Sequence, residues 1–269
     1  MVRWLFLVFL SSCGGQGKTL AAELFTLFLQ ATGQDVQVFS ADVQQKLSSK
    51  VGGQVITIDT DLLDEAAEDP LVTLRAFAPL SQAVARSAKN GSSILLDTAA
   101  TWDTATIRYL HDMRFDRLVA DAGGELVLVL VTTANPDAIR AMVSSTEKIR
   151  ETLPSARVVW ILNEHFGPVT FNAGLLGLRP AQLAEMRATV TEVVFPRMND
   201  LLWQPVDRAG MNMVDFVAAD PATLAGFWLD GAGNSLDDPA TLRVVQRRIA
   251  AWIGGLMEAA AQVARFPAA

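Results

Sequence analysis

Residues 4–19 read WLFLVFLSSCGGQGKT, an apolar run that leads directly into a glycine-rich turn. This stretch has two interpretations that exclude each other. Up to Cys13 it has the layout of a lipoprotein leader: Arg3, an apolar run, and Leu10-Ser11-Ser12-Cys13 at the position of lipid attachment. From Cys13 onward it has the layout of a phosphate-binding loop, which requires the same apolar run as a buried strand in front of it.

The length of the run from Trp4 to Leu10 favours the strand. Its seven residues are at the lower limit for the apolar part of a leader and far short of the roughly 20 that cross a membrane. A short apolar run bounded by Ser and Gly suits a strand that is buried on both faces of a parallel sheet. A leader would also leave the residues GGQGKT unexplained. We therefore predict a strand at Trp4–Leu10.

The composition predicts a compact protein with a large core. Of the 269 residues, 51% are hydrophobic and 19% are charged, and at this length one large α/β domain fits as well as two small ones. A single cysteine excludes a disulfide framework and suits a reducing compartment, so we expect a cytoplasmic protein. The net charge of −7 argues against general binding of nucleic acid.

Short runs rich in Val, Ile and Leu alternate with longer segments of helical spacing. The predicted strands are Trp4–Leu10, Val36–Phe39, Val55–Ile58, Ile94–Leu96, Leu126–Val131, Val158–Leu162 and Val193–Phe195. The predicted helices are Leu20–Ala31, Leu71–Ala88, Thr104–Leu118 and Asp137–Leu153. This alternation predicts an α/β fold with a doubly wound, mostly parallel sheet and helices on both of its faces.

We expect residues 1–269 to form a single domain. Gly167–Arg179 is the longest irregular stretch, which we interpret as a surface loop. From Asp237 onward an apolar stripe predicts one long helix over residues 237–265. The polar side of this helix is basic at first and then turns neutral (GGLMEAAAQVARF), which favours packing on the domain over binding to a membrane.

The pattern G-x-x-x-x-G-K-[ST] of phosphate-binding loops aligns with Ser12–Thr19, with Ser12 in place of the first glycine. The glycines that follow let the backbone curl, so that its amides and the N-terminus of the next helix favour an anion. Lys18 would bridge the β- and γ-phosphates, and the Thr19 hydroxyl would ligate Mg²⁺. A glycine-rich turn without function is the alternative, but a buried strand before the motif and a helix after it are the context that the motif requires.

The segment Cys-Gly-Gly-Gln-Gly-Lys-Thr also resembles the variant loop K-G-G-x-G-K-[ST], the deviant Walker A motif of the MinD/ParA-like P-loop ATPases. Other segments resemble that family in the same order along the chain. These are Ser40-Ala41-Asp42-Val43-Gln44, Leu95-Leu96-Asp97-Thr98, Leu128–Thr133, Val158–Asn163 and Phe195-Pro196. Within the family, VVWILNEHFGPV is most similar to the TraL/StbB-like proteins, which are encoded with conjugation and plasmid-stability genes.

The resemblance implies a role for each matched residue. Asp42 would orient the attacking water, Asp97 would reach Mg²⁺ through water, and the Asn163 amide would contact adenine. Lys18 and Asp42 are the implied catalytic residues, and the implied metal ligands are Thr19, Asp42 and Asp97. The implied nucleotide-binding residues are Gly14, Gly15, Gln16, Gly17, Lys18, Thr19, Leu20, Asn163 and Pro196. The amide of Asn163 leads us to expect a modest preference for ATP over GTP.

One departure from the family pattern concerns the chemistry. The family has a lysine ahead of the two glycines that reaches the nucleotide of a partner subunit, and this chain has Cys13 at that position. Loss of a cationic contact across an interface removes stabilisation of the transition state. Three outcomes are then open. Another basic residue such as Lys46 or Lys50 replaces the missing lysine, hydrolysis is slow, or ATP serves mainly as a ligand for dimerisation.

The resemblance implies ATP and Mg²⁺ as cofactors and a nucleotide-dependent switch as the function. ATP would close a homodimer, and a protein partner or cargo adaptor would respond to the change, with plasmid partition or conjugation as the expected setting. DNA is not favoured as a partner by the net charge. The alternatives are a metabolic phosphotransferase or ligase on the same scaffold, similar to dethiobiotin synthetase, and a slow or inactive ATPase that serves as a structural partner.

Overall fold

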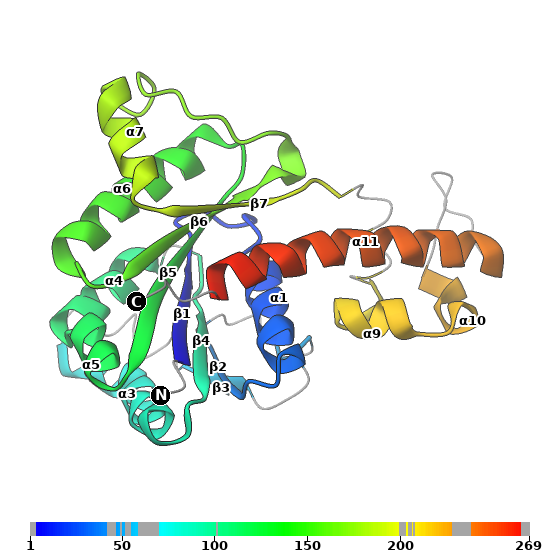
Figure 1. The fold of residues 1–269 in the computed structure, drawn as a ribbon, viewed down its shortest axis with the longest axis horizontal. Coiled ribbons are helices and arrows are strands. Elements are labelled where there is room, and N and C mark those ends of the chain that lie inside the picture. The colour runs from blue at the N-terminus through cyan, green and yellow to red at the C-terminus, as the bar shows by residue number, and fades with distance from the viewer. Residues whose placement is uncertain are drawn as a thin grey trace.

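The computed structural model describes residues 4–41, 47–48, 50–51, 55–58, 70–100, 102–198, 203, 206, 208–227 and 238–264. These residues contain a seven-stranded sheet with the order β3-β2-β4-β1-β5-β6-β7, and each neighbouring pair of strands is parallel (Figure 1). The strands are β1 (Trp4–Leu10), β2 (Val36–Ser40), β3 (Val55–Thr57), β4 (Ser93–Asp97), β5 (Gly124–Thr132), β6 (Arg157–Asn163) and β7 (Thr191–Phe195).

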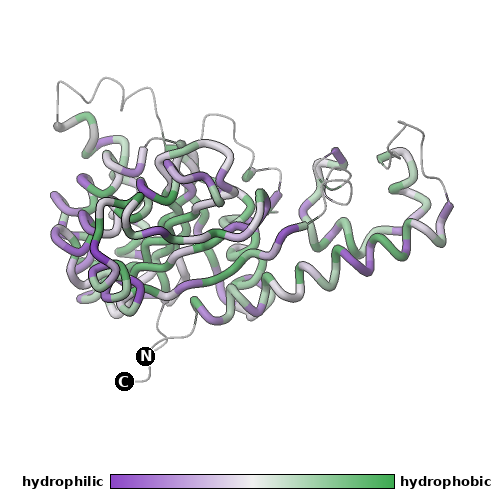
Figure 2. Tube along the Cα trace, turned by 90° about the horizontal axis from the view of Figure 1, so that it is seen from above, coloured by the Kyte–Doolittle hydropathy of each residue, from purple (hydrophilic) through white to green (hydrophobic). Residues whose placement is uncertain are grey.

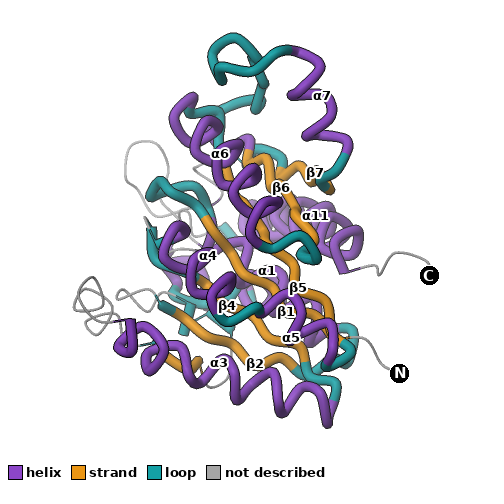
Figure 3. The backbone as a smooth tube through the Cα atoms, turned by 90° about the vertical axis from the view of Figure 1, so that its left-hand side faces the viewer, coloured by secondary structure: helices purple, strands orange, loops and turns teal. Residues whose placement is uncertain are grey.

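Helices cover both faces of this sheet (Figure 3). The described α-helices are α1 (Lys18–Ala31), α3 (Pro70–Asn90), α4 (Asp103–Asp112), α5 (Phe115–Asp121), α6 (Pro136–Thr152), α7 (Pro180–Ala188), α9 (Met213–Ala218), α10 (Pro221–Leu224) and α11 (Pro239–Ala264). Two short 3₁₀ turns follow β6 and α10. They are η1 (Glu164–Phe166) and η2 (Ala225–Phe227). Both the predicted α/β class and the doubly wound arrangement are therefore confirmed.

The sheet divides the core into two halves, and β1 contributes side chains to both. All seven of its residues are buried, because the strand lies between β4 and β5 in the middle of the sheet. Successive side chains point to opposite faces, so Leu5, Leu7 and Phe9 join one hydrophobic cluster and the alternate residues join the other. The hydropathy colouring shows apolar segments gathered in the interior of the fold (Figure 2). The strand predicted at Trp4–Leu10 is confirmed at both ends.

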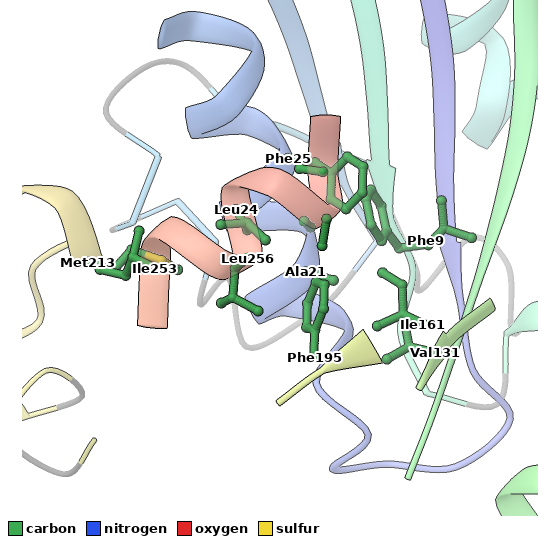
Figure 4. Packing of buried hydrophobic residues seen from close by; sticks show 14 of the residues in the cluster. Phe9, Ala21, Leu24, Phe25, Val131, Ile161, Phe195, Met213, Ile253 and Leu256 are labelled. Carbon is green, nitrogen blue, oxygen red and sulfur yellow. The ribbon is translucent and has the colours of Figure 1, made fainter. Parts of the chain in front are cut away.

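The first half of the core holds α1 and α11 against the sheet (Figure 4). Phe9 of β1 meets Phe25 of α1 edge to face, with ring centroids 5.5 Å apart. Leu256 of α11 is fully buried in the same cluster. The apolar stripe of the C-terminal helix therefore packs against α1. The second half of the core, under α3 to α6, covers the opposite face.

The register of the strands brings their carboxyl ends together. Phe9 of β1 lies beside Asp97 of β4, and Leu10 lies beside Leu130 of β5. On the other side of β5, Thr132 pairs with Leu162, one residue before the end of β6. The loops that leave β1, β4, β5 and β6 therefore begin at one edge of the sheet. In open parallel sheets this edge is where ligands bind.

Each of the seven predicted strands is present, but one predicted helix is wrong. The segment predicted as a helix over Thr104–Leu118 is two helices, α4 and α5. The break falls at Arg114, which has φ 50° and ψ 45°, in the left-handed region. Helices α7, α9 and α10 were not predicted, because they are only 9, 6 and 4 residues long. The irregular stretch predicted over Gly167–Arg179 contains no helix or strand.

Helix α11 is longer than the face that it covers. Its 26 residues span about 39 Å, and its N-terminal half extends beyond the sheet beside α9 and α10 (Figure 1). Asp238 caps its first turn, and the hydrogen bond from the Thr241 hydroxyl holds the pKa of the Asp238 carboxyl below its ordinary value. Among the described residues, no helix combines the length and the apolar character that crossing a membrane requires.

Candidate nucleotide-binding site

The loop between β1 and α1 is shaped by glycines at left-handed backbone angles. Gly15 has φ 72° and Gly17 has φ 94°, a region that other residues rarely adopt. Gly17 is the N-cap of α1, and among the described residues no side chain caps this helix. The N-terminus of α1, with its partial positive charge, therefore follows directly from the curled loop. This arrangement favours a bound anion.

Lys18 and Thr19 form the first turn of α1. Lys18 is buried, with 8% of its surface exposed, which is unusual for lysine. The Thr19 hydroxyl donates a hydrogen bond of 3.0 Å to Oδ2 of Asp97, the last residue of β4. Asp97 is 1% exposed. The central strands thus place a cation, a hydroxyl and a carboxylate at the mouth of one loop.

The pair Thr19 and Asp97 fits the predicted Mg²⁺. Hydroxyl and carboxylate oxygens are hard ligands, and Mg²⁺ is commonly held by one or two such protein groups together with substrate phosphates. Within the part of the chain that the structure describes, no cluster of three or more His, Cys, Asp or Glu residues offers a metal cage. The Thr19 hydroxyl at the start of α1 and the Asp97 carboxylate at the end of β4 are oxygen groups of the type that Mg²⁺ accepts as ligands.

The segment after β4 lies against the glycine loop. The Thr98 hydroxyl donates to the backbone oxygen of Phe9 over 2.7 Å, so the end of β4 is fixed to the end of β1. A methyl group placed on Gly14 would lie 3.9 Å from Cβ of Ala100, in ordinary van der Waals contact. The segment that begins at Asp97 is therefore in a position to respond to a ligand in the loop.

The Gln16 side chain holds the loop from behind. Its Oε1 accepts hydrogen bonds from the amide and the hydroxyl of Thr133, over 2.9 and 2.8 Å, and its Nε2 donates to the oxygen of Gly14 over 3.0 Å. Gln16 is 5% exposed and Thr133, next to the end of β5, is fully buried. The side chain of Gln16, which the resemblance places among the nucleotide-binding residues, is thus turned into the protein.

Asn163 also contacts the loop. At the end of β6, its Nδ2 donates to the backbone oxygen of Gln16 over 2.9 Å, and its Oδ1 accepts from the amide of His165 over 3.2 Å. A Cβ on Gly17 would lie only 2.6 Å from Nδ2 of Asn163, so the amide occupies the space that the missing side chain leaves. The contact with adenine implied for Asn163 stays a prediction.

Ser12, which replaces the first glycine of the motif, has a partner of its own. Its hydroxyl donates to Oδ2 of Asp103 in the first turn of α4, and the Ser145 hydroxyl of α6 donates to the same oxygen over 3.2 Å. Asp103 is 4% exposed, and these residues line a small pocket together with Leu130. The substitution thus connects the loop to two helices that pack on the second core half.

The other predicted residues lie in varied surroundings. Leu20 is partly buried and packs on the first core cluster. Pro196 is exposed, and its backbone oxygen accepts from Nε1 of Trp252 in α11 over 2.8 Å. Lys50, one candidate for the missing cation, donates to the oxygen of Met211 over 3.0 Å. Asp42 and Lys46 lie outside the described residues, so the predicted roles of both stay predictions.

Three contributors to the site were missed by sequence reasoning. Thr133 and Asp103 contact the loop from the end of β5 and from α4, and Ser145 of α6 contacts Asp103. The pair Thr132-Thr133 after a strand of apolar residues is a weak signal, since polar residues commonly follow a buried strand. For Asp103 and Ser145 the sequence contains no signal, because each contact joins residues distant in the chain.

No protein-family model matches the chain, and none of the curated proteins matches it. Solved structures with a similar arrangement include MinD of Aquifex aeolicus, at 13% identity and a TM-score of 0.44, over 93% of this chain and 97% of that one. Apo McdA from Cyanthece matches at 14% identity and a TM-score of 0.47, over 80% and 94% of the two chains.

Chloroplast FtsY from Physcomitrella patens matches at 16% identity and a TM-score of 0.43. This match covers 73% of the present chain, which spans 60% of the length of the FtsY chain. TM-scores below 0.5 at such identities are too low to assign a family or an activity. The fold class therefore rests on the chain's own sheet order and strand direction.

Proposed function

We propose that the protein binds Mg·ATP at the loop between β1 and α1 and hydrolyses it, as a nucleotide-dependent dimerisation switch of the MinD/ParA type. ATP closes a homodimer, and hydrolysis or product release opens it. A protein partner or cargo adaptor responds to the difference between the two states. The similarity of VVWILNEHFGPV to TraL/StbB-like proteins supports a setting in plasmid partition or conjugation.

The observation that carries this proposal is the joint position of the residues at the start of α1. Gly17 has the left-handed backbone that curls the loop, Lys18 follows it as a buried cation, and the Thr19 hydroxyl contacts Asp97 over 3.0 Å. A left-handed glycine alone is common in turns. A loop between a central parallel strand and a helix that adds a cation, a hydroxyl and a carboxylate matches the needs of a nucleotide phosphate with Mg²⁺.

In this proposal the residues of the loop have separate tasks. Lys18 neutralises charge on the phosphates, Thr19 and Asp97 hold the metal, and Asp42 orients the water that attacks the γ-phosphate. Bound Mg·ATP supplies the phosphoanhydride bond and a metal ion that neutralises the phosphate oxygens. Catalysis in this class depends on position and on electrostatic stabilisation, so the geometry of the loop sets the rate.

ATP turnover and molar mass, measured together with ATP, with ADP and without nucleotide, test this proposal. The chain has a mass of 29.0 kDa, so light scattering distinguishes a monomer from a species of twice that mass. We expect the larger species only when ATP and Mg²⁺ are both present. We also expect phosphate to be released slowly. If ATP binds without a change in mass, the protein is not a dimerisation switch. That result would favour the alternative function, a phosphotransferase or ligase. Failure to bind ATP at all would leave only a structural role.

A further inference from the structure

The Asn163 amide is oriented by the protein on both of its sides. Its Nδ2 has the Gln16 backbone oxygen at 2.9 Å, and its Oδ1 has the His165 amide at 3.2 Å. The nitrogen therefore faces an acceptor and the oxygen faces a donor, which leaves one assignment of the amide. If the amide were rotated by half a turn, its oxygen would face the Gln16 oxygen and its NH₂ group would face the His165 amide. Two hydrogen bonds within the protein therefore hold the side chain in place.

The loop is built to receive this side chain. Gly17 has φ 94°, and a Cβ on it would approach Nδ2 of Asn163 to 2.6 Å, closer than a Cβ comes to another heavy atom. Any residue other than glycine would thus displace the Asn163 amide as well as strain the backbone. Asn163 lies over the same peptide units whose curl forms the anion site, between the Gln16 oxygen and the N-cap of α1.

We propose that Asn163 is a positioning residue for the phosphate loop, which acts through the loop on the phosphates of every nucleotide rather than on the base. This inference rests on the proposed function, since it concerns the same site. By holding the oxygen of Gln16, Asn163 fixes the peptide units of a loop that contains Gly14, Gly15 and Gly17 and would otherwise have many conformations. A loop that is ordered in advance loses less entropy when the phosphate binds.

A second set of contacts supports this role. The Gln16 side chain is fixed from β5 through the amide and hydroxyl of Thr133, and the Gln16 backbone is fixed from β6 through Asn163. Two neighbouring strands thus hold one loop residue through its side chain and its main chain. This convergence on Gln16 indicates that the position of the loop, common to all nucleotides, is what Asn163 determines.

The test compares binding of ATP, GTP and inorganic tripolyphosphate, all with Mg²⁺, to the full chain and to Asn163→Ala. Tripolyphosphate has no base, so it reports on the loop alone. We expect all three affinities to fall by the same factor, about two- to tenfold, as loss of one hydrogen bond predicts. The ratio of ATP to GTP affinity should stay that of the wild type.

Asn135→Ala is the matched control. Asn135 caps α6 through a hydrogen bond from the amide of Asp137 over 2.8 Å, in the same way that Asn163 accepts from His165. Asn135→Ala removes this cap and no contact to Gln16, so it should lower the melting temperature and leave all three affinities unchanged. Asn163→Leu, which keeps the branched shape without the amide, should repeat the result of Asn163→Ala.

Two outcomes would overturn the inference while the proposed function stands. One is a loss of ATP affinity with tripolyphosphate binding unchanged in both Asn163 variants, which would make Asn163 a reader of the base. The other is unchanged binding of all three ligands, which would mean that the loop keeps its shape without Asn163. If the wild-type chain binds neither a nucleotide nor tripolyphosphate, the proposed function and this inference fail together.

Discussion

At the residue scale, the most direct prediction concerns the lysine at the start of α1. Lys18 is buried beside the curled loop, and the proposed function gives it the charge of the phosphates to neutralise. Lys18→Ala should weaken ATP binding about tenfold or more, since hydrogen bonds to charged groups contribute about 1.5–3 kcal/mol. Isothermal titration measures this loss, and a circular dichroism melt shows that the fold is retained.

Lys89→Ala, at the exposed C-terminal end of α3, is the control for a general change in charge. It should bind ATP as the wild type does. Equal affinity in Lys18→Ala and Lys89→Ala would refute the assignment of the phosphate loop.

Cys13 permits a test of the missing cation. The backbone of Cys13 is fixed by Ser11, whose hydroxyl donates to the Cys13 oxygen over 2.9 Å, so a new side chain at residue 13 leaves these contacts in place. Cys13→Lys should raise single-turnover hydrolysis about tenfold or more with little change in ATP affinity, because the contact forms mainly in the transition state. Cys13→Ala should hydrolyse as slowly as the wild type. An unchanged rate in Cys13→Lys would show that another residue already supplies the charge.

The residues of the site divide into those that the sequence predicts and those that it does not. Lys18 and Thr19 belong to a local motif, so their spacing alone predicts where they lie. The partners of the loop are separated from it by long stretches of chain: 91 residues for Ser12 and Asp103, and 117 for Gln16 and Thr133. Contacts of that range depend on strand order and register, which a single sequence does not specify.

At the element scale, the strands were predictable because the sheet buries both of their faces. Residues such as Trp4 to Leu10 can then be apolar without interruption, and the run itself marks the strand. The break between α4 and α5 was not predictable, because Arg114 carries no sign of a left-handed backbone. Arginine has good helix propensity, so the segment has the composition of one continuous helix.

This break leads to a prediction about stability. The left-handed backbone of Arg114 costs a residue with a side chain about 1–2 kcal/mol, and the extra chain entropy of glycine offsets roughly 0.5–1 kcal/mol of any gain. Arg114→Gly should therefore raise the free energy of unfolding by up to about 1 kcal/mol, since the Arg114 side chain is exposed. Urea denaturation measures the change.

Arg117→Gly provides the opposite case on the same short helix. Arg117 is exposed within α5 at helical angles, so glycine there should lower the free energy of unfolding by about 1 kcal/mol. If both substitutions destabilise the protein, Arg114 makes contacts that outweigh its backbone strain.

At the scale of the whole molecule, the N-terminal half of α11 forms an extension with α9 and α10 (Figure 1). One buried polar side chain of α11 contributes to the attachment of this extension. Gln246 is 7% exposed, and its Nε2 donates to the backbone oxygens of Phe216 and Ala219 at the end of α9, over 3.1 and 2.9 Å. The C-terminal half of α11 packs on α1, so the same helix joins this extension to the helix that begins at the phosphate loop.

Gln246→Leu should loosen the extension without affecting the site. The substitution removes the Gln246 donor from two backbone oxygens, in one buried and one partly buried contact, at a cost of about 1–3 kcal/mol, and the cost falls on α9, whose end these oxygens form. Amide hydrogen exchange in α9 should therefore accelerate about fivefold or more, while exchange in β1 and β5 and the affinity for ATP stay unchanged. Gln262→Leu, at an exposed position of the same helix, is the matched control and should exchange as the wild type does. If α9 is equally protected in both variants, apolar packing of Phe216 and Met213 holds it. If exchange accelerates in β1 as well, the extension unfolds together with the sheet and belongs to one cooperative unit.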